Sequence, residues 1–291
     1  MDMNSGISRI MVLGAGLMGR GITHVGALGG YQITLVDINE ELLSRAVGTI
    51  RGNLEKGVHL GKLQSADAEA AMGRIRITTD LAVAAGEADI VIEAVPEEIE
   101  LKQRVFKQLD ELCPPRTILA TNTSAKSITE IGCVTKRMDR TVGMHFFNPA
   151  HIMKLVEVIQ GLETSEETAA VIEGVARRMG KEPIRVNEAP GFAASRINAM
   201  ISNEAFYMLM EGVASAKDID KALKLGLNHP MGPFEQGDLV GWDTRLSVLE
   251  YLHQTLGEKF RPCPLMVKYV RAGRIGRKVG RGVYEYGEKK G

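Results

Sequence analysis

The chain has 291 residues, of which 44% are hydrophobic, which is enough for one large or two moderate folded domains. Its 36 lysines and arginines balance its 36 aspartates and glutamates, so no net field favours nucleic acid or an anionic membrane as a partner. Three cysteines lie far apart with no C-x-x-C pair, so we predict neither a disulfide framework nor a bound metal.

The first residues lack the positively charged segment, followed by a long apolar segment, that is typical of a secretory signal peptide. No apolar run approaches about 18 residues, the length of a membrane-spanning helix. We therefore expect a cytoplasmic protein that has no membrane partner.

Residues 1–187 alternate short apolar runs with helical patterns, which is typical of a parallel sheet covered by helices, an α/β fold. Apolar residues recur every three or four positions over 98–112, which predicts a helix. Two more helices are predicted over 165–179 and from 40 to about 63, and the second is long enough to form a protruding arm. The predicted strands are 9–13, 32–36, 75–78, 90–94, 117–120, 141–144, 155–159 and 183–186.

The character of the sequence changes at the turn signal Glu188–Gly191, after which helical patterns dominate. We therefore predict a doubly wound α/β domain over residues 1–187 and a smaller all-α domain over 188–291. The Met-rich and Leu-rich helices of the second domain are suited to packing against a second copy of the chain, so we expect a homodimer. Its predicted elements are helices over 196–211, 216–225, 243–256 and 265–272 and one strand over 283–286.

Three glycines, Gly14, Gly16 and Gly19, follow the first predicted strand in a G-x-G-x-x-G pattern and open a helix. In this pattern the first glycine permits a tight turn, the second lets the backbone approach a pyrophosphate, and the third lets helix and strand pack closely. Asp37 ends the second predicted strand, where its carboxylate would bind a ribose and repel a 2′-phosphate. An ordinary glycine-rich turn is the alternative, but strand, helix and acid in register favour a Rossmann-like domain that binds NAD rather than NADP.

Polar side chains follow two neighbouring predicted strands. Ser124 comes after one of them and His145 after the next, and the carboxyl ends of such strands face the ligand crevice of a doubly wound sheet. Glu157 stands in an apolar run, where a lone carboxylate is costly to bury, and His145 is its obvious partner. A neutral imidazole can take a hydroxyl proton while hydride leaves for a nicotinamide, and the carboxylate then stabilises the imidazolium. Ser124 and Asn148 can supply hydrogen bonds to the same oxygen or to the histidine.

Each of these residues also has a structural interpretation. His145 could be a satisfied histidine at a strand end, Glu157 could face solvent on an edge strand, and Ser124 could cap a helix. Asn-Pro is a common turn dipeptide. Because all of these residues follow a nucleotide-binding pattern and are expected at the same end of the sheet, catalytic roles are favoured over the structural ones.

The remaining histidines and the basic tail predict no further chemistry. His151 lies six residues after His145, which is wrong for a helix-borne metal pair, and His24 is expected to be structural or solvated. The segment 271–281 is basic and rich in glycine but lacks interleaved aromatic residues, so a solvated tail is favoured over a nucleic-acid site.

Several motifs along the chain form a set that is unlikely to occur together by chance. In chain order they are G-A-G-L-M-G, V-I-E-A-V-P-E, T-N-T-S, H-F-F-N-P-A-H-I-M-K-L-V-E-V-I, P-G-F, N-H-P-M-G-P-F-E and G-R-K-V-G-R-G-V-Y-E-Y. This set resembles the L-3-hydroxyacyl-CoA dehydrogenase family, most closely its bacterial 3-hydroxybutyryl-CoA dehydrogenases, and the similarity spans nearly the whole chain. The resemblance implies NAD-dependent oxidation of a short-chain (S)-3-hydroxyacyl-CoA to a 3-ketoacyl-CoA, and the reverse reduction of acetoacetyl-CoA.

The resemblance also implies roles for single residues. His145 would be the general base and Glu157 its orienting partner, while Ser124 and Asn148 would contact the reacting oxygen or order the site. Lys56, in the predicted arm, would meet the phosphates of coenzyme A. The residues that these motifs assign to the cofactor are Gly14, Gly16, Leu17, Met18, Gly19, Asp37, Ala94, Glu97, Lys102 and Asn122, with Glu97 and Lys102 near the nicotinamide end.

One position departs from the family pattern. The family usually reads G-F-x-x-N-R after the domain boundary, with the asparagine reaching the active site, whereas this chain has Ser195 there. Serine keeps a donor and an acceptor but is shorter. We assign Ser195 to the substrate site, acting directly or through a water, with Asn198 or Asn203 as alternatives that compensate from one to two turns further along.

Two other functions stay open at this point. A relative with the same scaffold could act on a free hydroxy acid instead of a thioester. A non-catalytic protein could also retain the nucleotide-binding fold, although the intact His145 and Glu157 argue against that interpretation.

Overall fold

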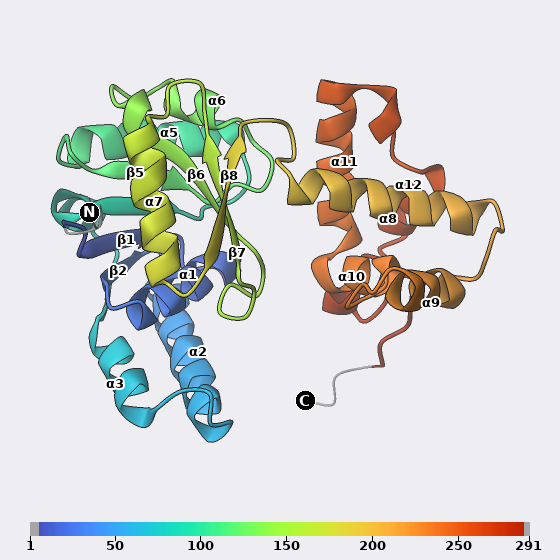
Figure 1. Cartoon of the computed structure of the whole chain (residues 1–291), viewed down its shortest axis with the longest axis horizontal. Coiled ribbons are helices and arrows are strands. Elements are labelled where there is room, and N and C mark those ends of the chain that lie inside the picture. The colour runs from blue at the N-terminus through green and yellow to red at the C-terminus, as the bar shows by residue number, and fades with distance from the viewer. Residues whose placement is uncertain (1–5, 288–291) are drawn as a thin grey trace. The chain divides into compact units, whose positions relative to one another are not determined.

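Eight strands form one sheet in the computed structural model, which describes residues 6–287 (Figure 1). The strand order is β3-β2-β1-β4-β5-β6-β7-β8, so the chain winds outward from β1 in both directions, as in Rossmann-like folds. All eight strands predicted within residues 1–187 are present, with ends shifted by at most two residues. They are β1 (Arg9–Leu13), β2 (Gln32–Val36), β3 (Ile75–Thr78), β4 (Ile90–Glu93), β5 (Ile118–Thr121), β6 (Thr141–Phe146), β7 (Leu155–Gln160) and β8 (Glu182–Asn187).

The sheet is not parallel throughout, which corrects the sequence prediction. β6 and β7 pair antiparallel, whereas every other neighbouring pair is parallel. Only residues 147–154 join these two strands. A parallel crossover needs a dozen or more residues, so this short connection forces the chain to reverse.

Helices cover both faces of the sheet because side chains alternate along each strand. Ile10 and Val12 of β1 pack on one face, whereas Met11 and Leu13 pack on the other. The first face is covered by α1 (Leu17–Leu28), α2 (Glu40–His59), α3 (Ser65–Gly73) and α7 (Glu166–Arg178). The second is covered by α4 (Leu81–Glu87), α5 (Ile99–Leu112) and α6 (Ile128–Gly132).

The predicted arm is present but consists of two helices. α2 ends at His59, short of the predicted residue 63, and α3 runs back beside it (Figure 1). Gly61 explains the break, because its φ of +67° is a left-handed conformation that terminates helices. The far end of the arm, where the chain passes from α2 to α3, extends away from the sheet (Figure 1).

The chain divides into two compact units, the first ending at Ala189 and the second beginning at Pro190. The second unit is helical, with a core around Phe206, whose ring lies edge-on to Trp242 at 4.7 Å. Its helices are α8 (Ala194–Met210), α9 (Ala216–Gly226), α10 (Pro233–Val240), α11 (Trp242–Leu256) and α12 (Pro264–Arg271).

The strand predicted over 283–286 is wrong, because the segment forms no strand. Asp238, 1% exposed on α10, accepts hydrogen bonds from the backbone N–H groups of Val283 (2.8 Å) and Tyr284 (2.9 Å) and from the hydroxyl of Tyr286 (2.9 Å). A buried carboxylate therefore takes the donors that a neighbouring strand would have used.

Candidate active site

The glycine loop after β1 leaves room for a dinucleotide. Gly14 has a φ of +104°, and a Cβ there would lie 2.7 Å from the carbonyl oxygen of Ala94. A Cβ on Gly19 would lie 1.7 Å from the carbonyl oxygen of Gly14, so both positions require glycine. A Cβ on Gly16, by contrast, would meet nothing within 4 Å.

The first turn of α1 fits a phosphate. Gly16 is the N-cap of α1 and supplies no side chain to the free N–H groups of that turn. Leu17 is exposed and Met18 is partly exposed beside this opening. Uncapped N–H groups and a positive helix end facing open space are the features that bind a pyrophosphate, so the loop fits NAD.

Asp37, directly after β2, is tied to the same loop. Its Oδ2 accepts a hydrogen bond from the N–H of Ala15 at 2.7 Å, and its Oδ1 accepts one from Asn39 at 3.3 Å. Among residues 6–287 no lysine or arginine forms an ion pair with it. A carboxylate in this position can still accept hydrogen bonds from ribose hydroxyls and repels a 2′-phosphate.

The carboxyl ends of β1, β4, β5 and β6 are held together at one edge of the sheet. The N–H of Ala94 donates to Leu13, and the N–H of Asn122 donates to Glu93, each at 2.8 Å. The side-chain oxygen of Asn122 accepts from the N–H of Phe146 at 2.9 Å. Asn122 thus joins the end of β5 to the end of β6, one residue from His145.

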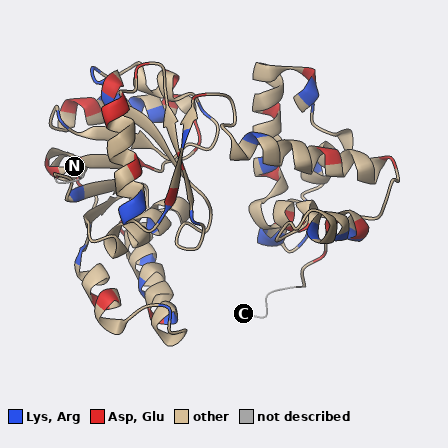
Figure 2. Cartoon of the chain, viewed as in Figure 1, with Lys and Arg blue, Asp and Glu red and all other residues tan. Residues whose placement is uncertain are grey.

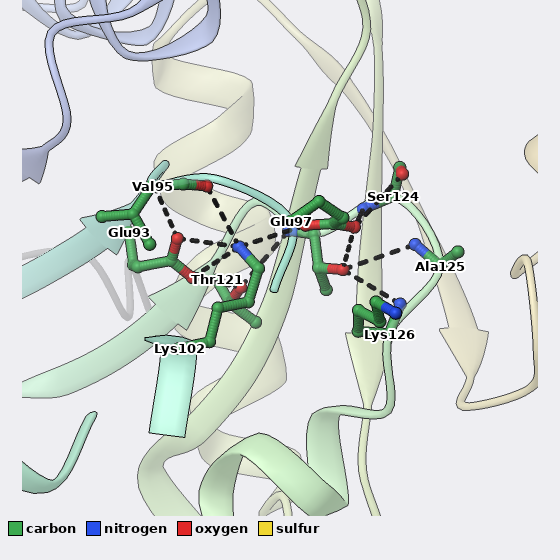
Figure 3. A network of polar contacts seen from close by, with 9 residues as sticks. Glu93, Val95, Glu97, Lys102, Thr121, Ser124, Ala125 and Lys126 are labelled. Carbon is green, nitrogen blue, oxygen red and sulfur yellow. Dashed lines mark hydrogen bonds and ion pairs between the residues drawn. The ribbon is translucent and has the colours of Figure 1, made fainter. Parts of the chain in front are cut away.

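A buried ion pair lies under this edge (Figure 3). Lys102 on α5 and Glu93 at the end of β4 are 1% and 0% exposed, and Nζ lies 2.8 Å from Oε1. Glu93 also accepts hydrogen bonds from the N–H of Val95 and the hydroxyl of Thr121, both at 2.7 Å. These bonds satisfy the buried charges, which would otherwise be costly.

Lys102 connects that pair to the loop after β5. Its Nζ lies 3.1 Å from Oε2 of Glu97, whose Oε1 accepts from the hydroxyl of Thr123 at 2.5 Å and from the N–H of Ser124 at 2.8 Å. The Ser124 hydroxyl lies 3.2 Å from the same oxygen (Figure 3). Burial alone would raise the pKa of Glu97, but Lys102 and the hydrogen bonds from Thr123 and Ser124 lower it below its usual value.

His145 and Glu157 face each other across β6 and β7. They are direct partners in the antiparallel register, and Nδ1 lies 2.7 Å from Oε2. His145 is 6% exposed and Glu157 is 0% exposed. The ring of Phe147 packs against the imidazole, with the ring centres 4.5 Å apart.

The other predicted substrate contacts of this unit lie nearer the surface. Asn148 is exposed two residues after the end of β6, and Lys56 is exposed on α2. Lys56 is close enough to His151 to help lower the pKa of that imidazole, after the larger effects of burial and Lys181. The arm therefore brings a cation toward the loop that joins β6 to β7.

His24, set aside as structural or solvated, is buried on α1 and stacks on His151 with ring centres 5.3 Å apart. Burial, His151 and Lys181 lower the pKa of His24 to about 4, so it is neutral near pH 7.

In the helical unit, Ser195 lies in the first turn of α8 and is partly exposed. Asn203 is occupied structurally, because its amide donates to the carbonyl of Arg261 at 2.9 Å and accepts from the N–H of Cys263 at 2.8 Å. The alternative that Asn203 compensates for the missing asparagine therefore conflicts with its packing.

Sequence reasoning missed Glu93, Thr121 and Thr123, which are 0% exposed and support Lys102 and Glu97. A signal was present, because Glu93 ends an apolar strand just as Glu157 interrupts one. Its lysine partner is nine residues away on another element, and only the fold brings the two together.

Basic and acidic residues are intermixed along the elements of both units (Figure 2). Within residues 6–287 no group of three or more His, Cys, Asp or Glu side chains is arranged to hold a metal ion. In the same range no helix has the length and apolar character needed to cross a membrane.

Comparison with known proteins identifies the family. The family model described as "3-hydroxyacyl-CoA dehydrogenase, NAD binding domain" matches residues 9–189, and the one described as "3-hydroxyacyl-CoA dehydrogenase, C-terminal domain" matches residues 191–286. A Bacillus subtilis protein named "Probable 3-hydroxybutyryl-CoA dehydrogenase" is 48% identical over 97% of this chain and 99% of its own length. The 3-hydroxybutyryl-CoA dehydrogenase of Bradyrhizobium diazoefficiens is 41% identical, over 96% of each chain.

Solved structures agree with these relatives. The crystal structure of (S)-3-hydroxybutyryl-CoA dehydrogenase from Ralstonia eutropha superposes with a TM-score of 0.93 at 43% identity, covering 97% of this chain and 100% of the other. The glycine loop, Asp37 and the strand order fit the NAD-binding role of the first matching domain. The chain therefore belongs to the 3-hydroxyacyl-CoA dehydrogenase family and is an NAD-dependent oxidoreductase.

Proposed function

We propose that this enzyme oxidises short-chain (S)-3-hydroxyacyl-CoA, such as 3-hydroxybutyryl-CoA, to the 3-ketoacyl-CoA with NAD, and reduces acetoacetyl-CoA in reverse. The names of the relatives support the substrate class. The single observation that carries the mechanism is the contact of 2.7 Å between Nδ1 of His145 and Oε2 of Glu157. This pair lies at the same sheet edge as the glycine loop.

His145 acts as the general base in this proposal. Nδ1–H donates to Glu157, which sets the tautomer and leaves the lone pair of the neutral ring on Nε2. Nε2 takes the proton of the C3 hydroxyl, and bound NAD supplies the hydride acceptor. The carboxylate of Glu157 stabilises the imidazolium that forms, and in the reverse direction the imidazolium returns the proton to the carbonyl oxygen.

Ser124 and Asn148 hold the reacting oxygen or order the site. The Ser124 hydroxyl and N–H both point at Glu97, so the Lys102–Glu97 pair sets the position of this serine. A hydroxyl that donates to a carboxylate keeps lone pairs that can accept the substrate hydroxyl. We assign Lys102, Glu97, Ala94 and Asn122 to the nicotinamide end of the cofactor site, with Gly14, Gly16, Leu17, Met18, Gly19 and Asp37 at the pyrophosphate and ribose.

Lys56 binds the phosphates of coenzyme A in this proposal. The side chain is exposed and lies near His151, so the arm presents positive charge beside the catalytic loop. Ser195 stands in the substrate site on α8, and the helical unit carries the contacts of a homodimer.

The reduction of acetoacetyl-CoA tests this function, followed as the loss of NADH absorbance. The variant His145→Gln should lower kcat by about 100-fold to 10,000-fold, the usual contribution of a general base. His253→Gln, on a partly exposed histidine of the helical unit, is the matched control and should retain the wild-type rate. Unchanged turnover in His145→Gln would refute the assignment.

Free acetoacetate compared with its CoA thioester separates the thioester dehydrogenase from an enzyme of free hydroxy acids. Lys56→Glu should raise KM for the thioester by about tenfold, which corresponds to about 1.4 kcal/mol, because an attractive charge is replaced by a repulsive one. If the KM for the thioester is the same in the wild type and in Lys56→Glu, Lys56 on α2 does not bind coenzyme A. NADH binding without turnover of any thioester would instead support a non-catalytic protein.

A further inference from the structure

A buried lysine of the first unit binds the loop 147–154, which joins β6 to β7. Lys181, between α7 and β8, is 6% exposed, and its Nζ donates to the carbonyl oxygens of Ala150 and Met153, the second at 2.9 Å. Among residues 6–287 no carboxylate forms an ion pair with this ammonium. A buried ammonium is costly unless its donors are satisfied, so its hydrogen bonds to the loop are what hold it there.

The local sequence fixes the backbone of Lys181 on both sides. Gly180 has a φ of +72°, the left-handed conformation that ends α7, and the N–H of Lys181 then donates to the carbonyl of Ala176 at 3.0 Å. The N–H of Glu182 donates to the carbonyl of Lys154 at 2.9 Å, so β8 begins beside the last residue of the loop. The side chain of Lys181 therefore starts from a fixed point next to the loop that it binds.

Helix α1 fixes the same loop by packing. Ala150 is 3% exposed and is the one buried residue of the segment 147–154, and a Cβ on Gly21 of α1 would lie only 2.9 Å from its Cβ. The next residue, His151, stacks on His24 of α1. The loop thus lies against α1 (Figure 1), and the buried ammonium binds its backbone.

The loop carries Asn148, which the proposed function places at the reacting oxygen or in ordering the site. Asn148 is exposed, and its amide forms no hydrogen bond with any residue in the range 6–287. Its position therefore depends on the backbone of the loop. Accurate placement matters for the rate, since a displacement of about 1 Å in a reacting or orienting group can cost about 100-fold.

We propose that Lys181 is a positioning residue of the reaction: by binding the carbonyls of Ala150 and Met153 it holds the loop, and thereby Asn148, in place at the reacting oxygen. This inference rests on the proposed function, and it adds a residue that acts only through the loop. The side chain contributes donors that reach two carbonyl groups. Arginine retains such donors and the charge, whereas methionine retains only the approximate length of the side chain.

The steady-state reduction of acetoacetyl-CoA measures the effect. Lys181→Met should lower kcat about tenfold, because Asn148 is displaced rather than removed, while the Kd for NADH stays within about twofold of the wild-type value. Lys181→Arg should restore most of the lost kcat. Lys154→Met, which removes an exposed lysine from the same loop, is the matched control and should retain the wild-type kcat. A wild-type kcat in folded Lys181→Met would overturn this inference and leave the proposed function intact.

A double-mutant cycle separates positioning from a general effect on the fold. Asn148→Ala should lower kcat about 100-fold, the usual cost of a lost hydrogen bond at the reacting oxygen. Addition of Lys181→Met should then lower kcat by less than about twofold more, because the two residues act through one contact. Losses that multiply, or a wild-type kcat in Asn148→Ala, would overturn the inference. Failure of the wild-type enzyme to reduce acetoacetyl-CoA would instead refute the proposed function.

Gly21→Ala provides a second variant in case Lys181→Met does not fold. Its methyl group would press on the Cβ of Ala150, so the loop must shift, and kcat should fall about threefold to tenfold. The double variant Gly21→Ala with Ala150→Gly should recover most of the wild-type kcat, because the nearest remaining atom of residue 150 is its backbone nitrogen at 3.6 Å, an ordinary contact. An unchanged kcat in Gly21→Ala would overturn the proposal. A loss that Ala150→Gly does not reverse would overturn it as well, since the rate would then depend on α1 and not on the loop.

Discussion

Glu93 and Lys102 form an ion pair of 2.8 Å in which neither side chain is more than 1% exposed. Two more donors, from Val95 and Thr121, complete the shell of Glu93, and Lys102 extends the pair to Glu97. This edge of the sheet thus rests on two buried charges, those of Glu93 and Lys102, whose partners are all protein groups.

Removal of one partner of this pair should destabilise the enzyme strongly. Lys102→Met leaves Glu93 buried without its cation, and we expect a loss of about 3–5 kcal/mol in the free energy of unfolding. Urea denaturation monitored by circular dichroism measures it. The double variant Glu93→Leu with Lys102→Met should lose less than the sum of the single variants, and strict additivity would show that the two charges do not depend on each other.

Glu157→Gln should reduce catalysis while keeping the shape of the site. The amide can still accept from Nδ1 of His145, but it no longer stabilises the imidazolium. We expect kcat to fall about 10-fold to 1,000-fold while the Kd for NADH stays close to that of the wild type. Glu163→Gln, on an exposed residue outside the site, is the matched control. A normal kcat would mean that the carboxylate only supports the fold.

Asp37 should govern the choice between NADH and NADPH. Asp37→Asn keeps an acceptor for the N–H of Ala15 but removes the charge that repels a 2′-phosphate. We expect the ratio of kcat/KM for NADH to that for NADPH to fall by about tenfold or more, which corresponds to about 1.4 kcal/mol. The ratio is measured with acetoacetyl-CoA as common substrate. Asp89→Asn, at the amino end of β4, is the control, and an equal change in both variants would contradict this role.

His24 should make the enzyme sensitive to acid. Its pKa is lowered to about 4 in the folded state, from an ordinary value of 6.5. Between these pH values the unfolded chain binds more protons, so stability is fully present above pH 6.5 and falls as the pH drops toward 4. The shift corresponds to roughly 3 kcal/mol.

Urea denaturation at pH 7.5 and pH 5 tests the effect of His24. In His24→Gln the difference in unfolding free energy between the two pH values should be smaller than in the wild type. His59→Gln, on an exposed histidine at the end of α2, should leave the difference unchanged. An undiminished difference in His24→Gln would assign the acid sensitivity to other groups.

The amino-acid sequence alone determined the strands, the main helices and the G-x-G-x-x-G turn. These features depend on local chemistry: the period of apolar residues, the conformational freedom of glycine and the place of polar residues after apolar runs. The family motifs likewise lie in short segments. The same local patterns were misleading at residues 283–286, where Asp238 captures the N–H groups, and for the direction of β7.

The tertiary structure decided which side chains meet. Antiparallel pairing of β6 with β7 sets His145 opposite Glu157, and the docking of α5 on the sheet places Lys102 between Glu93 and Glu97. Register, burial and charge pairing depend on contacts between distant segments, so the energy of each of these groups is defined only once the chain has folded.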